Sequence, residues 1–454
     1  MRPTSQAPRE DAAGTSRGRR LPGGRRAWVA LLVVLVVLAV VVTLLVRRDG
    51  GLDAAVEAVE GGSPSASPAP RPVTVATLLG VTDAQQAAPR QRWRLVGTTD
   101  NTGGTGINTV CQESRFADPE GEGTFVRSFA TTNAPRRTLL QTVEISASAQ
   151  AAEAAYNTTL GWFAGCRVAR LQLQGTYRLD GLGDEAQLLR LRLPDARRPA
   201  LTRTFVVGVV RTGALTVSTV AMTRGGDAVA NDAAARVLTT AVTGLCETDP
   251  AGDCPGEVRA TPVLPPRSGE ALGTLAAADL PVVGSINRPW VGTRPVPARP
   301  NPSATTCDQA DFVRSGAPRA RTRTFLVPGA RVDERFGVSQ TYGRFPTVAR
   351  AQRLVDRVEA AMARCEKDDL SASVSAAQVD RPGPRDSVSS SWRLDSEVRE
   401  DTSVGYWMGV ARVGRWVTQV LLTPVARADV DAATFEALVV RARDRLFGLT
   451  GPRR

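Results

Sequence analysis

The sequence predicts an α+β fold in which two tandem modules, each an antiparallel sheet covered by helices and stapled by a disulfide, follow one N-terminal transmembrane helix. Three observations predict it. A run of 20 apolar residues lies near the N-terminus, a set of landmarks recurs about 200 residues apart, and all six cysteines follow the apolar run. The length of 454 residues suits two or three domains of roughly 100–200 residues each.

The apolar run at residues 27–46 predicts a membrane helix, because about 1.5 Å per residue gives it a span of about 30 Å. Residues 1–48 carry nine arginines against two acids, so the positive-inside rule predicts a cytoplasmic basic tail at 1–26. A cleaved signal peptide would have an apolar region of about 7–15 residues and a small-residue cleavage site, whereas this run ends in TLLVRR. We therefore expect this run to be a signal anchor that binds the lipid bilayer. The chain would then be a single-pass plasma-membrane protein whose C-terminal region is extracytoplasmic.

Composition excludes several functions. The formal net charge is +12, but residues 1–48 hold +7 of it, which leaves only +5 for the remainder. The remainder has no basic-aromatic stripe of the kind that a nucleic-acid groove needs, so we expect no nucleic-acid partner. Without histidine, no Ser-His-Asp or Cys-His nucleophile and no histidine metal ligand can be built. No pair of cysteines has CxxC spacing, and we expect neither a metal nor a cofactor.

Sequence features that recur in the same order predict that the chain contains two copies of one module. In order, they are a tryptophan, a cysteine, a second cysteine, a glycine turn and an aspartate before a closing helix. The pairs are Trp93 and Trp290, Cys111 and Cys307, Cys166 and Cys365, Gly213 and Gly414, and Asp232 and Asp431.

The repeat also predicts the disulfides. Equivalent places in the two modules favour Cys111–Cys166 and Cys307–Cys365, with separations of 55 and 58 positions. That pairing leaves Cys246–Cys254 to close a small loop at the end of the first module. All six cysteines lie in the predicted extracytoplasmic part, where oxidation makes disulfides the default.

Periodicity predicts the elements of each module. Helices are expected to end at Cys166 and Cys365, the second with Pro346 in its first turn, and further helices, capped by Asp232 and Asp431, to close the modules. Hairpins are expected to turn at Thr212-Gly213 and Val413-Gly414. The expected strands of the first module are Thr124–Phe129, Leu139–Ile145, Glu185–Leu193, Arg203–Arg211 and Leu215–Met222. Those of the second are Arg323–Leu326, Arg335–Thr341, Ser389–Leu394, Gly405–Val413 and Trp416–Leu422.

Composition sets the expected boundaries. A Pro/Ser/Gly-rich stalk at 47–74 lifts the modules off the membrane. The first module covers 75–256, a Pro-rich linker with the leading segment of the second module covers 257–303, and the second module covers 304–454. Because 11 of the chain's 30 prolines fall in Glu247–Ser303, we expect a spacer there, in preference to a polyproline II segment that docks a partner.

The order of these motifs resembles a known family. A leading Leu-rich segment (Ala76–Gln86 or Leu272–Leu280) precedes a Cys, strands, a helix ending in Cys, a Gly-Leu-Gly-Asp-Glu-Ala turn at Gly181–Ala186, a hairpin and a final helix. This order resembles the extracellular sensor domain of mycobacterial PknH-type receptor Ser/Thr kinases and related actinobacterial membrane-anchored sensor-domain proteins, over residues 75–249 and, less well, 268–449. The resemblance implies a non-catalytic, disulfide-bonded α+β module with a cleft that binds an envelope ligand.

The chain departs from that family in two ways. It holds no kinase domain, and its second module has Arg385-Asp386 in place of the Gly-Asp-Glu turn. Any binding site of the first module therefore need not recur in the second.

Few residues are candidates for chemistry. Asp184 and Glu185 suggest paired carboxylates, but adjacent residues of a strand point to opposite faces, which favours a strand-entry turn. The tryptophans can either line a ligand or partner surface or pack in the core. Core packing is favoured, because aromatic side chains dominate core burial. The candidate surface comprises Trp93, Asp184, Glu185, Trp290 and Trp407, with Trp416 as a further aromatic.

The sequence thus predicts a non-catalytic, single-pass membrane protein of the cell envelope. The near-total use of arginine over lysine resembles that of actinobacterial proteins, so we expect an actinobacterial cell envelope. Its extracytoplasmic, sensor-like region is expected to bind an unknown envelope protein or small-molecule ligand. One alternative is a carboxylate-based cell-envelope hydrolase, which needs two acidic side chains in one cleft. The other is a structural spacer in a secretion, division or wall-synthesis complex.

Overall fold

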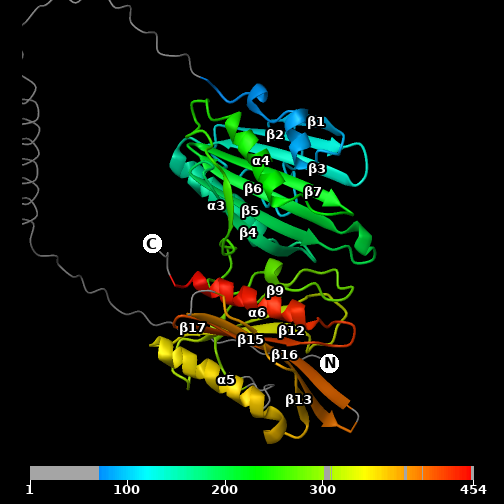
Figure 1. Cartoon of the computed structure of the whole chain (residues 1–454), viewed down its shortest axis with the longest axis vertical. Helices are drawn as coiled ribbons and strands as arrows, with labels where there is room; N and C mark the ends of the chain where they lie inside the picture. Colours follow the sequence, from blue (N-terminus) through cyan, green and yellow to red (C-terminus); the bar gives the residue numbers. More distant parts are fainter. Residues whose placement is uncertain (1–70, 301–306, 308, 383–385, 401, 451–454) are drawn as a thin grey trace, which may run out of the picture. The chain divides into compact units, whose positions relative to one another are not determined.

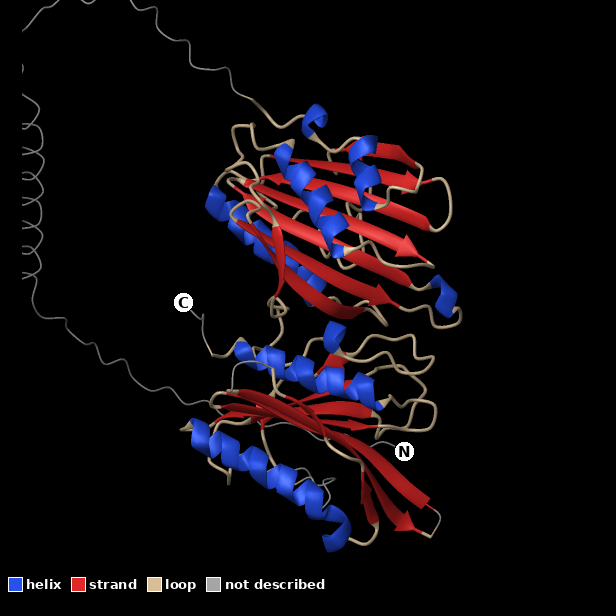
Figure 2. Ribbon diagram, in the orientation of Figure 1, coloured by secondary structure: helices blue, strands red, loops and turns tan. Residues whose placement is uncertain are grey.

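The computed structural model describes residues 71–300, 307, 309–382, 386–400 and 402–450. Within these residues it has two antiparallel sheets, five α-helices and three disulfides (Figures 1 and 2). No helix among them combines the length and apolar character that a bilayer crossing requires. The predicted membrane helix at 27–46, the tail at 1–26 and most of the stalk lie outside the described residues.

The first sheet has eight strands in the order β1-β2-β3-β7-β6-β5-β4-β8. All of its neighbouring strands are antiparallel. The strands are β1 (Trp93–Thr99), β2 (Gly123–Thr131), β3 (Arg136–Ile145), β4 (Gln172–Asp180), β5 (Glu185–Leu193), β6 (Arg203–Thr212), β7 (Leu215–Arg224) and β8 (Arg259–Pro262).

The second sheet runs β10-β11-β12-β17-β16-β15-β13, with β9 beside β11 and β14 beside β15. Its strands are β9 (Val291–Gly292), β10 (Val296–Pro297), β11 (Arg321–Leu326), β12 (Gly337–Arg344), β13 (Ala372–Val374), β14 (Gln378–Asp380), β15 (Ser387–Arg399), β16 (Thr402–Val413) and β17 (Trp416–Thr423). Its central order β11-β12-β17-β16-β15 repeats the order β2-β3-β7-β6-β5 of the first sheet. We call the two sheets with their helices the first and second modules.

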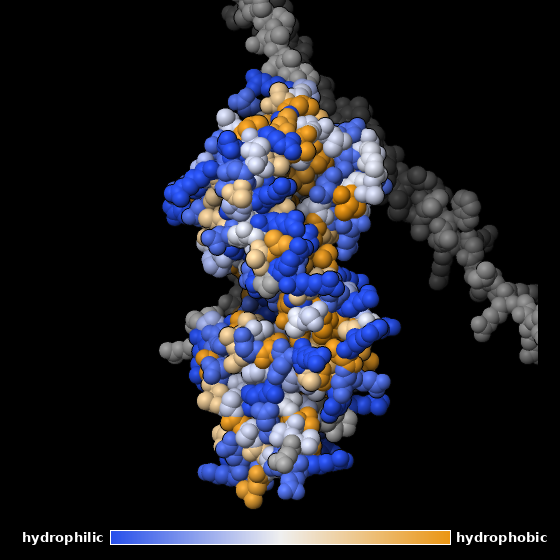
Figure 3. All heavy atoms as spheres, turned by 90° about the vertical axis from the view of Figure 1, so that its right-hand side faces the viewer, coloured by the Kyte–Doolittle hydropathy of each residue, from blue (hydrophilic) through white to orange (hydrophobic). Residues whose placement is uncertain are grey.

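Helices cover both faces of each sheet (Figure 2). In the first module, α4 (Asn231–Thr243) packs on the face with Val206 and Val210, and α3 (Ala149–Ala164) packs on the face with Val207 and Val209. In the second, α6 (Ala432–Phe447) and α5 (Val348–Asp368) cover the two faces in the same way. The fifth helix, α2 (Val81–Ala84), lies in the leading segment of the first module. On the face in Figure 3, small apolar groups alternate with hydrophilic residues.

The helices α3 and α5 correspond in their N-caps, their anchoring cysteines and much of their buried faces. Ser148 and Thr347 cap them, and Cys166 and Cys365 anchor their ends, so both pairs are 199 positions apart. At that offset their buried faces coincide, with Ala152, Ala155, Tyr156, Thr159 and Phe163 opposite Ala351, Leu354, Val355, Val358 and Met362. This shared inner face is what packs each helix on its sheet.

A polar clamp holds the leading segment of each module against its sheet. In the first, buried Gln141 accepts the amide hydrogen of Leu79 at 2.9 Å, and Arg127 donates to the Leu79 carbonyl at 2.9 Å. In the second, buried Gln340 accepts the amide hydrogen of Leu275 at 2.8 Å, and Arg323 donates to the Leu275 carbonyl at 3.4 Å. Each pair lies on two neighbouring strands, Arg127 opposite Gln141 and Arg323 opposite Gln340.

The three predicted disulfides are confirmed: Cys111–Cys166, Cys246–Cys254 and Cys307–Cys365, with Cα–Cα distances of 5.1, 4.9 and 5.2 Å. The two long-range bonds tie α3 and α5 to the segment that precedes β2 or β11. Repeat position was thus a sufficient guide to the pairing.

All ten predicted strands exist; Glu185–Leu193 has the predicted bounds, and the other nine differ at one or both ends. Hairpin turns fall one residue later than expected, at Gly213 and Ala214 and at Gly414 and Arg415, because the glycines at φ 57° and 54° take the left-handed first turn position. Asp431 caps α6 as predicted, but Asp232 does not cap α4: Ala230 is the N-cap. Asp232 lies instead in the first turn, where its charge favours the helix dipole.

Two further helix predictions need correction. Helix α5 continues to Asp368, three residues beyond Cys365, and its N-cap is Thr347, which leaves Pro346 before the first turn. The strands β1, β8, β9, β10, β13 and β14 at or near the sheet edges, and β4 between β5 and β8, were not predicted. They are mostly short or mixed in polarity, so they lack the alternation that marks a strand.

The Pro-rich stretch is more than a spacer. Its β8 extends the first sheet, and β9 and β10 join the second. Between them, Ala278 belongs to the apolar cluster under α3. Glu270 also pairs with Arg167 at 3.1 Å and Arg323 at 2.6 Å. Proline-rich composition therefore did not mark a segment without tertiary contacts.

Candidate functional site

The structure does not bring the predicted surface residues together. Trp93 lies at the start of β1 and Trp407 on β16, each 8% exposed. Trp407 donates from its indole N–H to Asp429 at 2.8 Å and lies under the guanidinium of Arg393, 5.1 Å from the ring centre. Trp416, at the start of β17, is half-buried. These contacts are those of packed side chains.

Asp184 and Glu185 occupy the predicted turn into β5. Asp184 accepts from the Arg211 guanidinium at 2.8 Å and from the Gly213 amide at 2.9 Å. Glu185 lies 3.9 Å from the same arginine. The two carboxylates share one cation and brace the β6–β7 hairpin, a structural arrangement.

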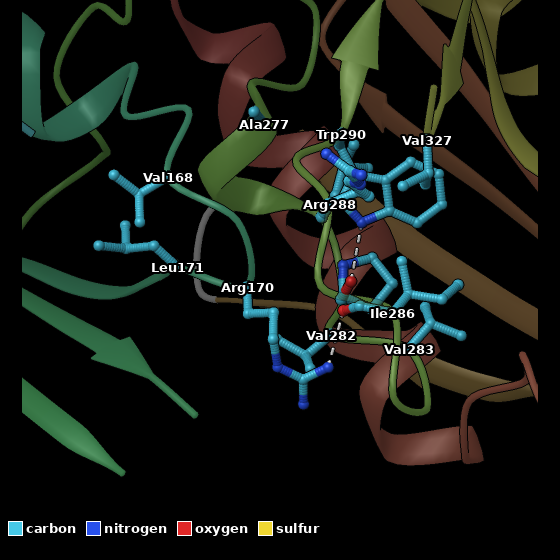
Figure 4. Close-up of a pocket in the computed structure, with 12 residues that line it drawn as sticks. Val168, Arg170, Leu171, Ala277, Val282, Val283, Ile286, Arg288, Trp290 and Val327 are labelled. Atoms are coloured by element: carbon cyan, nitrogen blue, oxygen red, sulfur yellow. Dashed lines mark hydrogen bonds between the residues drawn. The ribbon is translucent and has the colours of Figure 1, made fainter. Parts of the chain in front are cut away.

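Trp290 lines a small cavity together with residues of both modules (Figure 4). Its indole N–H donates to the Pro281 carbonyl at 2.9 Å, and Arg170 donates to the Ile286 carbonyl at 2.9 Å. The cavity volume is about 20 Å³. That is room for a water molecule and too little for a ligand.

The second module carries a larger cavity, which we call the hydroxyl groove. Its volume is about 740 Å³, within the range of small-molecule sites. Alternate residues of three neighbouring strands form its floor, because successive side chains of a strand point to opposite faces. The floor residues are Thr322 and Thr324 on β11, Ser339 and Thr341 on β12, and Gln419 and Leu421 on β17.

Apolar and charged side chains form the walls of the groove. Val296 and Val313 are exposed at its rim, and Phe312 is buried behind it. Among the lining residues that the structure describes, Asp311 is the one acid, and this side chain accepts the Arg314 amide hydrogen at 2.9 Å and pairs with the Arg314 guanidinium at 3.4 Å. One carboxylate that already has an arginine partner does not supply the two carboxyl groups that a hydrolase needs.

The floor of the groove suits a neutral, hydrogen-bonding ligand, while Arg299, Arg314 and Asp311 line the groove beside it. Thr322 and Thr341 share a hydrogen bond of 2.8 Å between their hydroxyls, and each hydroxyl keeps acceptor capacity for a guest. A molecule with hydroxyl or amide groups on one side and an apolar edge on the other would match the floor and the rim.

The first module has partly different side chains at the same places. Matching the paired residues of the two sheets puts Val126 opposite Thr322, Leu140 opposite Ser339 and Ser218 opposite Gln419. Ser128 and Thr142 lie opposite Thr324 and Thr341, so two of the four floor hydroxyls recur in the first module. The hydroxyls of Thr322 and Ser339 and the amide of Gln419 are particular to the second module.

Acidic side chains do gather in another cavity, of about 500 Å³, beside β4 and α6. Asp380, Glu436 and Asp444 line it. Asp380 and Asp444 both pair with the buried Arg443, at 2.6 and 3.4 Å. Burial raises the pKa of Asp444, and the charges of Arg443 and Arg441 oppose that shift. A buried guanidinium is stable only when negative charges pair with it. The two acids beside Arg443 therefore have a structural role.

Among the residues that the structure describes, no cluster of three or more acidic or cysteine side chains has the geometry of a metal site. No known family model matches the sequence, and no curated protein resembles it significantly. The groove must therefore be interpreted from its own chemistry.

The residues of the hydroxyl groove were not singled out from sequence. A signal was present, since Ser339 and Thr341 alternate on a predicted strand and Thr324 lies on another, although Thr322 precedes the predicted bounds of that strand. Alternating hydroxyls are also common on the solvent face of an antiparallel sheet, so the pattern alone could not distinguish a site from a wet surface.

Proposed function

We propose that this chain is a single-pass membrane protein of the cell envelope whose extracytoplasmic modules bind a ligand or an envelope partner without catalysing a reaction. The hydroxyl groove of the second module is the proposed site. The observation that carries this proposal is a cavity of about 740 Å³ whose floor is neutral and hydrogen-bonding. The resemblance to PknH-type sensor modules points the same way.

A neutral floor with one arginine-paired acid favours binding over hydrolysis. Hydrolysis at a glycosidic bond needs one carboxyl group as acid and a second as base or nucleophile. Among the described residues that line the groove, Asp311 is the one acid. The hydrolase alternative rests on Asp380 and Asp444, and replacing either by asparagine would abolish such an activity while leaving groove binding intact.

Native mass spectrometry of the full chain, extracted from its own envelope in neutral detergent, tests the proposed site. The wild type should retain a bound molecule. Ser339→Trp, which places an indole over the floor, should lose it. Ser373→Trp, an exposed serine on β13 of the same sheet, is the matched control and should retain it. A molecule that survives Ser339→Trp would contradict the groove, and recovery of protein partners alone would favour the spacer alternative.

The membrane topology has its own test. A reporter that is active only outside the cytoplasm should work when fused after Arg454 and fail when fused at Gly24. The reverse pattern would place the modules in the cytoplasm and remove the oxidising environment on which the disulfides depend.

A further inference from the structure

Four arginines form a row along one flank of α5. Arg350, Arg353, Arg357 and Arg364 are spaced by three, four and seven residues, and all four are exposed. Since residues three, four and seven apart lie on one side of an α-helix, the row is continuous. At about 1.5 Å per residue, it is about 21 Å long.

The row borders a concave surface. A cavity of about 610 Å³ lies between this flank and the loop at residues 314–316, and all four arginines line it. Arg357 donates to the hydroxyl of Ser315 at 2.7 Å, which holds the loop against the helix. Arg314, 89% exposed, adds a fifth guanidinium from the loop side. We call this surface the arginine groove.

Two of the four acids of α5 lie elsewhere. Glu359 accepts from Ser390 and Glu366 from the Val374 amide, so both face the opposite flank and serve packing. Asp356 lines the groove and accepts from Gln352, Asp368 lies 3.8 Å from Arg364, and Asp311 lies 3.4 Å from Arg314. Three acids against five arginines leave the groove with a net positive charge.

The first module shows that the fold does not require this row. At the offset of 199 positions that aligns α3 with α5, the four arginines correspond to Ala151, Ala154, Thr158 and Gly165. The buried faces of the two helices match, whereas the outer flanks differ in every one of these positions. The arginines are therefore a feature of the second module that packing does not explain.

From this geometry we infer that the arginine groove binds a linear polyanion with phosphate groups repeated along its length. Guanidinium groups bind phosphate through two parallel N–H donors, which makes arginine the side chain of choice for such a partner. A row about 21 Å long contacts several phosphates of one chain at once.

Two observations narrow the partner. The surface is concave, which fits one extended chain better than a planar bilayer. None of the described residues that line it is aromatic, so the groove recognises phosphates and offers no stacking platform for bases. Arg314 also lines the hydroxyl groove, but the four arginines of the row do not, so either proposal can fail alone.

The test is a titration of the full chain in neutral detergent with fluorescently labelled long-chain polyphosphate. Binding should weaken with salt, with a slope of log affinity against log salt near −3, about 0.7 for each of four arginines. The double variant Arg353→Gln/Arg357→Gln should lower the affinity by about 100-fold, at about tenfold for each charge-assisted contact. Tripolyphosphate, which is too short to span the row, should compete weakly.

Matched variants separate a site from general charge. Arg399→Gln removes an exposed cation of β15, outside the row, and should leave the affinity within about twofold. Arg353→Lys/Arg357→Lys keeps the charge, so the salt slope should persist while the affinity falls. All three variants alter exposed side chains, and thermal unfolding should confirm that they fold. Equal binding by the Gln double variant and the wild type would overturn the inference. Row-dependent binding to phosphatidylglycerol vesicles but not to polyphosphate would also overturn it, in favour of a lipid surface.

Discussion

The first and second modules use one scaffold with different chemistry. Their central strands have the same order, their helices α3 and α5 share a cap, an inner face and a disulfide, and an arginine–glutamine clamp holds each leading segment. They differ on surfaces that packing leaves free. The arginine row belongs to the second module, as do the floor hydroxyls of Thr322 and Ser339. The comparison teaches that the contacts shared by the two modules report on folding, whereas the unmatched positions are those for which we propose binding.

The interiors also differ at one equivalent acid. Asp83 and Asp279 each follow the clamped leucine by four positions and accept a backbone amide, from Gly80 and Ala276. Asp279 is in addition fully buried and pairs with Arg445 at 2.7 Å and Arg441 at 3.7 Å. The first module has Gly244 and Thr240 at the matching places of α4, so Asp83 meets no such cations there.

The largest effect is therefore expected from Asp279→Asn. It leaves two largely buried guanidinium groups without their counter-charge, and we expect a loss of about 3–5 kcal/mol in the free energy of unfolding. Asp83→Asn keeps an acceptor for the Gly80 amide and should change stability by less than about 0.5 kcal/mol. Urea unfolding of a fragment covering residues 69–454, the compact unit of the chain, measures both. Equal effects would show that the two acids play one role.

The disulfides give the next largest effect and test the equivalence itself. Removing Cys111–Cys166 or Cys307–Cys365 by paired alanine substitution should cost about 2–5 kcal/mol each, and similar amounts, because both loops have nearly the same length. Removing Cys246–Cys254, which spans 8 positions, should cost about 1–2 kcal/mol less. Unfolding with and without reductant provides the measurement. A short-loop variant that proves the most damaging would contradict the loop-length argument.

The clamps should differ by a smaller amount. Gln340 uses its whole amide: it accepts from Leu275 and donates to the Gly273 carbonyl and the Thr418 hydroxyl. Gln141 accepts from Leu79, but its buried amide nitrogen has no hydrogen-bond partner. Gln340→Ala should therefore cost about 1–3 kcal/mol and Gln141→Ala less, because the latter also removes an unsatisfied group. A ranking in the opposite order in urea unfolding would refute this account.

Much of the scaffold could be predicted from the sequence because its determinants are local or repeated. Alternating apolar residues marked the central strands, and helical spacing marked the helix that carries Cys365. Position in the repeat gave the disulfides. The polar clamps could not be predicted in this way: Gln141 and Gln340 are single buried polar residues, and their partners are backbone groups more than 60 positions away.

The candidate sites were harder to predict for the same reason: their residues are far apart in the sequence and meet only in the folded structure. A groove floor such as Thr322, Thr341 and Gln419 assembles from three strands that meet only in the sheet. For the tryptophans, core packing was the favoured interpretation, and Trp93, Trp290 and Trp407 are indeed buried. The arginine row was visible in sequence, but its meaning appeared only when the register of α3 and α5 showed what the fold itself requires.

The smallest expected effect concerns how each module holds the loop after its first cysteine. In the first module Glu144 on β3 is buried and accepts the amide hydrogens of Ala117 and Asp118, at 2.9 Å each. The second module has Gly343 at this place, where an added Cβ would lie 2.9 Å from the Cβ of Ala317. One loop is thus fixed by a carboxylate and the other by close packing.

Only the first arrangement should respond to pH. Burial raises the pKa of Glu144 above its ordinary value of 4.5, although the two amide donors oppose the shift. In the window between the two pKa values, the folded state binds more protons than the unfolded state, so stability falls as pH rises through it. Glu144→Gln, which keeps an acceptor, should flatten the pH dependence above about 4.5 in urea unfolding of the 69–454 fragment. Glu122→Gln, on an exposed carboxyl nearby, should leave the wild-type profile unchanged. If the two variants give the same profile, the Glu144 carboxylate is not what couples the first module to pH.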